Sequence, residues 1–329
     1  MRVIEARNVN DAYGQALRVL KARGALRESR AGPVLVHPGP VTTAYKRPLE
    51  RVLFDPARDA NPFFHLFEVL WMLAGRADVE WLSRFNSNIA KVASDDGVTL
   101  HGAYGRRWRW HWGTDQLRRI GDGLRANPDC RRQVLQAWDP TEDLGNTTTK
   151  DVPCNVAAAF QVNPEGAVDL TVFCRSNDIV WGCYGSDAVT FGTLLEYVAA
   201  LAGRPAGRYW QVSVNWHGYV ATLPEPNLEV PCPYETGMVE PVSLVRDPAT
   251  WDAELKVFMD VGADALGYRE PFFRRVAVPM LAAWDTFKRI EAPGRYDVPI
   301  GLLSTLEHDW ALAARQWLER RRDKWLKTK

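Results

Sequence analysis

One cysteine and one arginine stand where they could act together as a nucleophile and its activating cation. Cys154 directly follows Pro153, and Arg175 comes one predicted hairpin later, immediately after Cys174. Because a nearby guanidinium stabilises a thiolate, Arg175 could lower the pKa of the Cys154 thiol and favour its nucleophilic form. The alternative interpretation is a buried cysteine beside a structural ion pair, since free cysteines often only fill protein cores.

Four arginines and one serine could bind a phosphate group. Arginine presents a planar fork of donors that matches phosphate oxygens in pairs. Taken singly, each of these arginines would be a solvated surface residue, so the prediction depends on whether they converge. The set is Arg30, Arg131, Arg132, Arg175 and Ser176.

The overall composition excludes several classes of protein. The chain has 329 residues, with 41 Lys+Arg against 40 Asp+Glu, and the formal net charge of +1 argues against a broad surface for nucleic acid. No apolar run reaches the roughly 18 residues of a membrane span, and the N-terminus lacks a signal-peptide core. Five cysteines without C-x-x-C spacing, and six histidines without ligand spacing, indicate neither disulfides nor a metal site. We therefore expect a cytoplasmic protein with reduced thiols.

Apolar periodicity predicts three helices that could position these groups. The segment 63–74 is apolar on nearly all sides and ends at Gly75, which is typical of a buried helix. Glu68 lies in the middle of that segment, where an unsatisfied carboxyl group is costly. The other two predicted helices cover 9–22 and 187–202.

Short apolar runs predict a sheet between these helices. The predicted strands cover 133–138, 156–162, 168–174 and 209–214. Antiparallel hairpins with long buried helices indicate an α+β fold rather than a doubly wound parallel sheet. No linker divides the chain, so we predict one domain over 1–329 with a divergent helical part from about 245 to 329.

Several blocks of the sequence, taken in order, resemble the thymidylate synthase family. The resemblance runs from about residue 28 to residue 220, roughly two thirds of the chain, and is much weaker in the last hundred residues. The blocks are Phe67–Gly75, Gly102–Trp108, Arg131-Arg132, Ala137-Trp138, Pro153-Cys154, Arg175-Ser176-Asn177-Asp178 and His217-Gly218-Tyr219.

The resemblance implies a three-layer α+β fold, with a mixed β-sheet flanked by long helices and two identical subunits joined sheet to sheet. Each subunit would bind a pyrimidine nucleoside monophosphate, with 5,10-methylenetetrahydrofolate stacked over it. No membrane or nucleic-acid partner is implied. The phosphate would be held by Arg30, Arg175 and Ser176 of one subunit and by Arg131 and Arg132 acting in trans from the other.

The same resemblance implies roles for other residues of the site. Cys154 would be the nucleophile, while Glu68 and Tyr104 would order water and move protons. His217 and Tyr219 would hold the sugar hydroxyl, and Asn177 would belong to the substrate site. The implied cofactor residues are Asp178, which would face the pterin, together with Trp71 and Gly182.

One departure from the family concerns the residue that reads the base. Thymidylate synthases use an asparagine, which accepts from uracil N3–H and donates to O4. Aligning the following helix puts Asp187 at that position, with Ser186 as the competing choice. An ionised carboxyl cannot donate to O4, whereas one that shares a proton with cytosine N3 and accepts from the N4 amino group can satisfy cytosine. Asp187 is thus predicted to be a cytosine reader and acid catalyst, or alternatively a helix N-cap.

A second departure concerns the fate of the one-carbon unit. Thymidylate synthases shield the exocyclic methylene intermediate with a tryptophan and an apolar C-terminus. Here the corresponding segment, 86–97, has no tryptophan, and the chain ends in the basic stretch 324–329. Room for water favours hydration of that methylene over hydride transfer. The role of Asn155, where many synthases have histidine, is not explained by the sequence.

We therefore predict folate-dependent C5-hydroxymethylation of a cytidine monophosphate, with dCMP as the favoured substrate and CMP as the alternative. The alternatives are C5-methylation of dCMP, or the reactions of a dUMP hydroxymethylase or a thymidylate synthase. A catalytically silent nucleotide-binding homologue is a further alternative, against which the intact Cys154, Arg175 and Glu68 argue.

Overall fold

A mixed eight-stranded sheet carries the residues of interest. The computed structural model describes residues 1–94, 96–226, 231–265 and 267–328. The main strand order is β1-β4-β8-β7-β6-β5, with β3 pairing the end of β8 and β2 pairing β3. The pairs β1–β4 and β7–β8 are parallel, and the others are antiparallel. The strands are β1 (Arg2–Ala6), β2 (Ala25–Arg27), β3 (Val34–Val36), β4 (Val41–Tyr45), β5 (Val134–Gln136), β6 (Asn155–Val162), β7 (Val168–Asp178) and β8 (Ala206–Tyr219).

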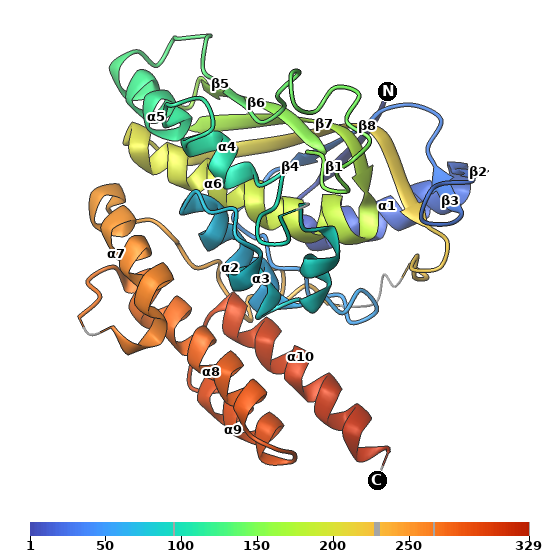
Figure 1. The fold of residues 1–329 in the computed structure, drawn as a ribbon, viewed down its shortest axis with the longest axis vertical. Helices are drawn as coiled ribbons and strands as arrows, with labels where there is room; N and C mark the ends of the chain where they lie inside the picture. Colours follow the sequence, from blue (N-terminus) through green and yellow to red (C-terminus); the bar gives the residue numbers. More distant parts are fainter. Residues whose placement is uncertain (95, 227–230, 266, 329) are drawn as a thin grey trace.

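Helices pack in successive layers beneath this sheet (Figure 1). Helices α1 and α6 contact the strands, α2 packs against α6, and α8 and α10 pack against α2. The α-helices are α1 (Val9–Arg23), α2 (Pro62–Leu73), α3 (Val79–Ser83), α4 (Tyr104–Arg109), α5 (Gln116–Ala126), α6 (Asp187–Ala202), α7 (Pro248–Val261), α8 (Val278–Arg289), α9 (Gly294–Leu303) and α10 (Asp309–Leu326). Shorter turns of helix are η1 (Ser87–Val92), η2 (Ile179–Ser186), η3 (Gly262–Asp264) and η4 (Phe273–Ala277).

Two buried helices place the central acidic residues. The side chain of Asn61 caps α2 by accepting from the backbone N–H groups of Phe63 and Phe64, and Pro62 occupies the first turn. Helix α6 starts at Asp187 and ends before Gly203, whose φ of 68° suits a residue without a Cβ. Because α6 lies between the sheet and α2, nearly all of its side chains are buried, including the carboxylate at its start.

One face of the central strands is open in the single chain. Side chains alternate between the faces of a strand, so Val172 of β7 is buried while Phe173 is 45% exposed. In the neighbouring strand β8, Val214 is 43% exposed. The register aligns Phe173 with Ala157 on one side and Val212 on the other. This part of the sheet therefore presents apolar side chains to its surroundings.

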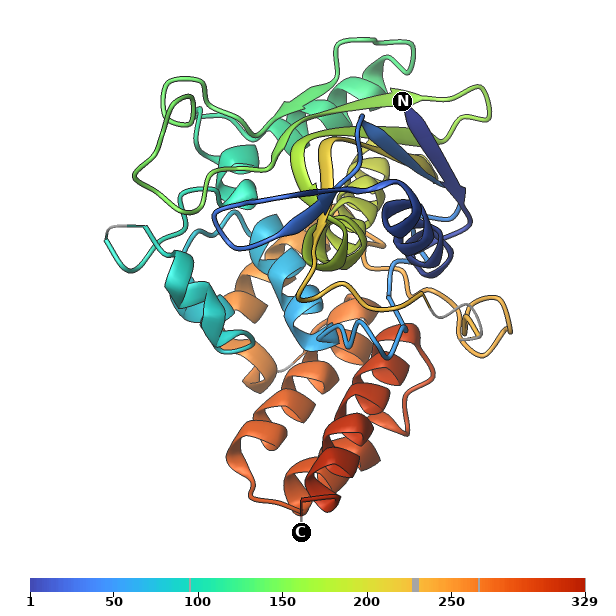
Figure 2. The same ribbon diagram turned by 90° about the vertical axis from the view of Figure 1, so that its right-hand side faces the viewer.

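The helices α7–α10 form a separate cluster at the end of the molecule away from the sheet (Figures 1 and 2). Trp310 and Trp317 of α10 are buried, and Arg320 and Arg321 form ion pairs with Asp59. Helix α10 thus packs on the rest of the fold, whereas the described residues of the basic end, 324–328, are mostly exposed. Among the described residues, no helix combines the length and the hydropathy needed to cross a membrane.

The predicted α+β fold with a mixed sheet is confirmed. All three predicted helices and all four predicted strands are present, although β7 continues four residues beyond its predicted end, to Asp178. The parallel pairing of β7 with β8, and the strands β1 and β4, were not predicted. A short apolar segment does not show which other strand it will pair with.

A prediction concerns the contact between α4 and α2. A Cβ on Gly105 would lie 1.9 Å from the backbone oxygen of Met72, so Gly105→Ala must push the two helices apart. We expect a loss of about 1–3 kcal/mol of stability, measured by chemical denaturation. The control Gly301→Ala, in an exposed helical position with no atom within 4 Å, should leave stability unchanged or raise it by up to about 1 kcal/mol. Equal effects of the two substitutions would contradict the proposed steric origin.

Candidate active site

The predicted partnership of Cys154 and Arg175 is present in the structure. Cys154 lies just before β6, and the backbone N–H of Arg175 on β7 donates to the Cys154 carbonyl oxygen at 2.9 Å. Nη2 of the Arg175 guanidinium lies 3.9 Å from Cys154 Sγ. The same guanidinium donates to the carbonyl oxygens of Pro153 at 2.8 Å and Val152 at 2.9 Å. Arg175 therefore both holds the loop that bears Cys154 and places positive charge beside its sulfur.

The resting state of the sulfur differs from the sequence-based expectation. Burial raises the pKa of the Cys154 thiol, and the Arg175 guanidinium opposes this rise without cancelling it. The carboxylates of Asp187 and Asp151 act in the same direction as burial. Cys154 is accordingly a thiol at neutral pH in the free protein, and its proton must leave when the sulfur attacks.

Tyr104 contacts the segment that bears Cys154 and Asn155. Its hydroxyl oxygen accepts from the backbone N–H groups of Cys154 at 3.1 Å and Asn155 at 3.0 Å. It also accepts from Asn155 Nδ2 at 3.1 Å. Burial raises the pKa of Tyr104 well above its usual value, so the hydroxyl stays neutral and its own hydrogen can be donated.

Asp187 lies buried among side chains from three neighbouring strands. Its Oδ2 accepts from Gln211 Nε2 of β8 at 2.6 Å and from Asn177 Nδ2 of β7 at 3.1 Å. Its Oδ1 accepts from Asn155 Nδ2 of β6 at 3.2 Å. Burial raises the pKa of Asp187, and these three amide donors oppose the rise. The N-cap interpretation is wrong, because the cap position is Ser186 and Asp187 contacts the strands instead.

Glu68 is the second unusual acid of the site. Burial raises its pKa to about 8, with smaller contributions from the charges of Asp187 and Asp151. Its Oε2 is buried without a hydrogen-bond partner among the described residues. Glu68 therefore carries a proton at neutral pH and has a buried polar atom without a partner among the described residues.

The ends of β7 and β8 bring further predicted residues together. Asp178 pairs in register with His217, and the rings of His217 and Tyr219 lie edge to face at 5.5 Å. The Asp178 carboxylate accepts from the backbone N–H of Val180 at 2.9 Å, and burial raises its pKa. A Cβ on Gly182 would lie 2.7 Å from Asn177 Oδ1, so a larger residue there would displace the Asn177 side chain.

Two tryptophans differ from the sequence-based expectation. Trp71 is 1% exposed, and its indole N–H donates to Asp78, so the predicted cofactor contact of Trp71 is not supported. Trp181 was missed, although it lies between Asp178 and Gly182 in the sequence. Its ring is 56% exposed and lies 4.6 Å from the Arg58 guanidinium. The signal available in the sequence was a tryptophan three residues after Asp178, the last residue of the Arg175–Asp178 block.

The predicted phosphate ligands do not all meet in one chain. Arg30 is exposed in the loop between β2 and β3. Arg131 and Arg132 are exposed before β5, where Val134 is level with Ala159 and thus with Thr171. From this row of residues, Arg175 lies four residues toward the end of β7, whereas Arg132 lies two residues in the opposite direction. At roughly 3.3 Å per residue, Arg132 and Arg175 are therefore about 20 Å apart along the strands. Arg131 and Arg132 cannot join Arg175 around one phosphate within a single chain, while Ser176 lies beside Arg175 in the sequence.

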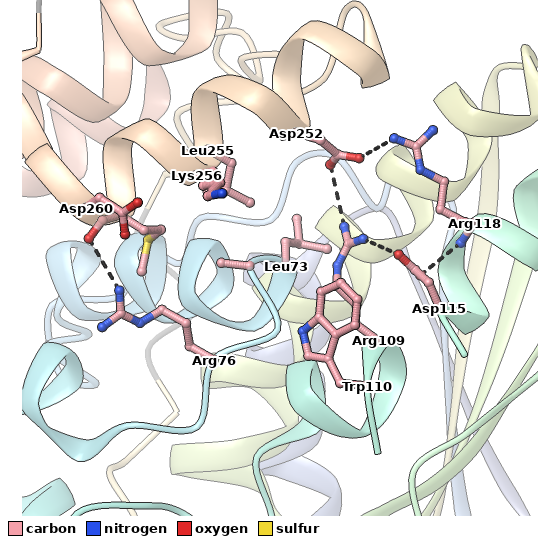
Figure 3. A pocket seen from close by; sticks show the side chains of 12 residues that line it. Leu73, Arg76, Arg109, Trp110, Asp115, Arg118, Asp252, Leu255, Lys256 and Asp260 are labelled. Carbon is pink, nitrogen blue, oxygen red and sulfur yellow. Dashed lines mark hydrogen bonds and ion pairs between the residues drawn. The ribbon is translucent and has the colours of Figure 1, made fainter. Parts of the chain in front are cut away.

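Two other features lie apart from Cys154. A pocket of about 570 Å³ opens between α2, α4, α5 and α7, where Asp252 bridges Arg109 and Arg118 (Figure 3). The pocket shares no lining residue with the site described above. The spacing of the histidines did not predict a metal site. In the structure, possible ligand atoms of three residues lie within 4.8 Å of one another, namely those of His111, Asp139 and Glu142.

Comparisons with known proteins add independent information. A family model described as thymidylate synthase matches residues 61–230. A deoxyuridylate hydroxymethyltransferase of Pseudomonas phage M6 is 49% identical over 98% of this chain and 95% of its own length. Another, of Bacillus phage SP01, is 38% identical over 55% of this chain and 49% of its own length. A putative thymidylate synthase of Methanothermobacter marburgensis is 33% identical over 40% of this chain and 57% of its own length.

A first prediction concerns the effect of Arg175 on the sulfur. Arg175→Met removes the guanidinium charge that lowers the pKa of Cys154, so the pH midpoint for alkylation of Cys154 by iodoacetamide should rise. Mass spectrometry of the peptide that contains Cys154 measures this rate against pH. The exposed Arg119→Met serves as the control and should leave the midpoint in place. An unchanged profile in Arg175→Met would show that the guanidinium does not act on the sulfur.

A second prediction concerns stability and Glu68. The folded state holds a proton on Glu68 that the unfolded chain releases above pH 4.5, so stability falls between about pH 4.5 and 8 and is level above that range. Glu68→Gln removes this cost and should stabilise the protein at pH 8 by about 4 kcal/mol, with little effect at pH 4.5. Denaturation at the two pH values measures the difference. A stabilisation of equal size at both would contradict the raised pKa.

Proposed function

This chain belongs to the thymidylate synthase family, and we propose that it is a deoxyuridylate C5-hydroxymethyltransferase. The observation that carries the proposal is the identity of 49% over 98% of the chain to a protein named for that activity. The arrangement of Cys154, Arg175 and Tyr104 supports an active enzyme, because a silent homologue has no need to hold a nucleophile loop in this way. The same proposal places the enzyme in the cytoplasm with its nucleotide substrate.

The proposed substrate differs from the one that the sequence favoured. Asp187 led us to expect cytidylate, but two relatives are named for deoxyuridylate, including the one that matches almost the whole chain. The structure adds a reason to doubt the simple cytosine reading. Asp187 is not an isolated carboxyl that faces the base alone, because three protein amides donate to it.

The chain's own residues suit the proposed chemistry. Cys154 Sγ adds to C6 of the uracil ring, and Arg175 stabilises the developing thiolate. The ring then exchanges its C5 hydrogen for a hydroxymethyl group, with the new hydroxyl oxygen supplied by water. The bond between Cys154 Sγ and C6 finally breaks, which restores the ring double bond and the free thiol. Glu68 is protonated at neutral pH, and Tyr104 has a free hydroxyl hydrogen, so both can exchange protons with the ring and with water. No hydride moves, so the overall reaction needs no oxidant or reductant.

The residues around Asp178 fit the expected folate. When bound, 5,10-methylenetetrahydrofolate supplies a one-carbon unit at the oxidation level of formaldehyde. A flat pterin needs an aromatic or open backbone surface and a polar group for its ring nitrogens. Trp181 offers an exposed indole, and Asp178 offers a half-buried carboxyl.

Two features support hydration over hydride transfer. Helix α10 runs away from the sheet and its C-terminal end lies at the opposite end of the molecule (Figure 1). The described C-terminal residues therefore do not close over Cys154, unlike the apolar C-terminus expected for a thymidylate synthase. Segment 86–97 has no tryptophan, its described residues are largely exposed, and its Asp95 lies outside the described residues. Both features leave the site open to water.

A homodimer is part of the proposal. The open face of the sheet bears Phe173 and Val214, apolar residues that a second copy would bury. Arg131 and Arg132 lie about 20 Å from Arg175 within one chain at the usual strand rise, so their proposed role at the phosphate requires the other subunit. His217 and Tyr219 keep their proposed place at the sugar.

One assay tests the proposed function. We expect the purified protein to convert dUMP, with 5,10-methylenetetrahydrofolate, into a product heavier by one CH₂O unit, detected by mass spectrometry. A product heavier by one CH₂ unit, with dihydrofolate absorbance, would indicate a thymidylate synthase instead.

Turnover of dCMP or CMP in preference to dUMP would restore the cytidylate prediction. Cys154→Ala should abolish turnover and retain dUMP binding, and equal inactivity of both proteins on all three nucleotides would indicate the silent homologue.

A further inference from the structure

A carboxylate at the base-reading position presents a physical problem for a uracil enzyme. Uracil offers N3–H, which needs an acceptor, and O4, which needs a donor. A single carboxylate supplies only acceptors. We propose that Asp187 and Asn155 read uracil jointly, with Asp187 Oδ1 accepting from N3–H, Asn155 Nδ2 donating to O4, and Gln211 as the positioning residue. This inference rests on the proposed function and names the residues that determine its specificity.

The hydrogen bonds of Asp187 leave one oxygen available. Oδ2 accepts from Gln211 at 2.6 Å and from Asn177 at 3.1 Å, which occupies both of its lone-pair directions. Oδ1 accepts only from Asn155, at 3.2 Å among the described residues. One acceptor direction therefore remains on Oδ1. A base placed beside Asp187 meets one acceptor there and no donor.

Gln211 determines which oxygen is occupied. The Tyr209 hydroxyl donates to Gln211 Oε1, so the amide nitrogen of Gln211 must face Asp187. Tyr209 is in turn held by a stacked ring, Tyr45, at 5.0 Å between centroids and 18° between planes. Gln211 is fully buried and cannot turn toward solvent. This chain of contacts keeps a donor on Oδ2, and the N-terminus of α6 adds a favourable potential for the carboxylate.

Asn155 has a hydrogen to spare. Its Nδ2 lies 3.1 Å from the Tyr104 hydroxyl oxygen and 3.2 Å from Asp187 Oδ1. The Tyr104 oxygen has two lone pairs, and the backbone N–H groups of Cys154 and Asn155 already point at it. Three donors thus share two lone pairs of the Tyr104 oxygen. The Asn155 Nδ2 hydrogen can therefore leave Tyr104 and donate to a base oxygen at little cost.

The pair discriminates against cytosine at both positions. Cytosine N3 carries a lone pair, which would face a lone pair of Asp187 Oδ1 as long as the carboxylate, which accepts from three amides, is ionised. The cytosine N4 amino group would face the amide N–H of Asn155, donor against donor. Unpaired polar groups in a buried site cost about 1–3 kcal/mol each, which corresponds to roughly tenfold or more in selectivity. The joint reader therefore prefers uracil even though one of its members is an aspartate.

The substitution Asp187→Asn separates this proposal from the family pattern. Gln211 and Asn177 would hold the new amide oxygen on their side, so the NH₂ group would face the base where an acceptor is needed. We expect kcat/KM for dUMP to fall by about 10- to 100-fold and the dUMP/dCMP ratio of kcat/KM to fall with it. A higher or unchanged ratio would overturn the joint reader, because a simple asparagine reader favours uracil.

Two further variants test the partners of Asp187. Asn155→Asp keeps the shape of the side chain and removes the donor, so it should lower kcat/KM for dUMP about tenfold or more, and Asn155→Ala should do the same. In the Asp187→Asn background, adding Gln211→Met releases the amide to turn, so use of dUMP should recover at least about fivefold. No recovery would contradict the positioning role of Gln211. Thr190→Val, one turn into α6, is the control and should leave the ratio unchanged.

Equilibrium binding of dUMP and dCMP by calorimetry accompanies these assays and needs no turnover. Circular dichroism confirms that each variant is folded. If the wild-type protein binds and converts dCMP in preference to dUMP, the proposed function itself fails. If the wild-type protein prefers dUMP but Asp187→Asn and Asn155→Asp keep that preference, only the joint reader fails.

Discussion

The structure depends on satisfying one buried carboxylate. Asp187 lies under the sheet at the start of α6, where an unpaired charge would cost several kcal/mol. Amides from three strands meet it, namely Asn155, Asn177 and Gln211. Each must come from a different strand, so the sheet has to form in its full register before the carboxylate is stable. The acid thus links the proposed specificity of the site to the register of the sheet.

The same contacts connect Asp187, the proposed base reader, to Cys154, the proposed nucleophile. Asn155 joins Asp187 to Tyr104, and Tyr104 accepts from the backbone of Cys154. On the other side, Arg175 holds the carbonyl groups just before Cys154. The nucleophile loop is therefore held from both sides by side chains of the rigid core. Such support keeps reacting groups within the small displacements that catalysis tolerates.

Burial has opposite consequences for the ionisable groups of this site. It raises the pKa of Glu68 to about 8, so that a proton is available near neutral pH. It also raises the pKa of the Cys154 thiol, which costs nucleophilicity and is only partly offset by Arg175. The site therefore supplies protons readily and generates its thiolate reluctantly, which suits attack that is coupled to proton removal rather than a permanently reactive sulfur.

The sequence by itself determined the elements and the chemistry of single residues. Apolar periodicity is local, so the helices at α1, α2 and α6 and the hairpin that joins Cys154 to Arg175 could be predicted from it. Only the tertiary structure decided which polar groups meet. Gln211 reaches Asp187 because β8 pairs in parallel with β7, a long-range register that no local pattern records. For the same reason the sequence suggested an isolated carboxyl at position 187, whereas the fold surrounds it with amides.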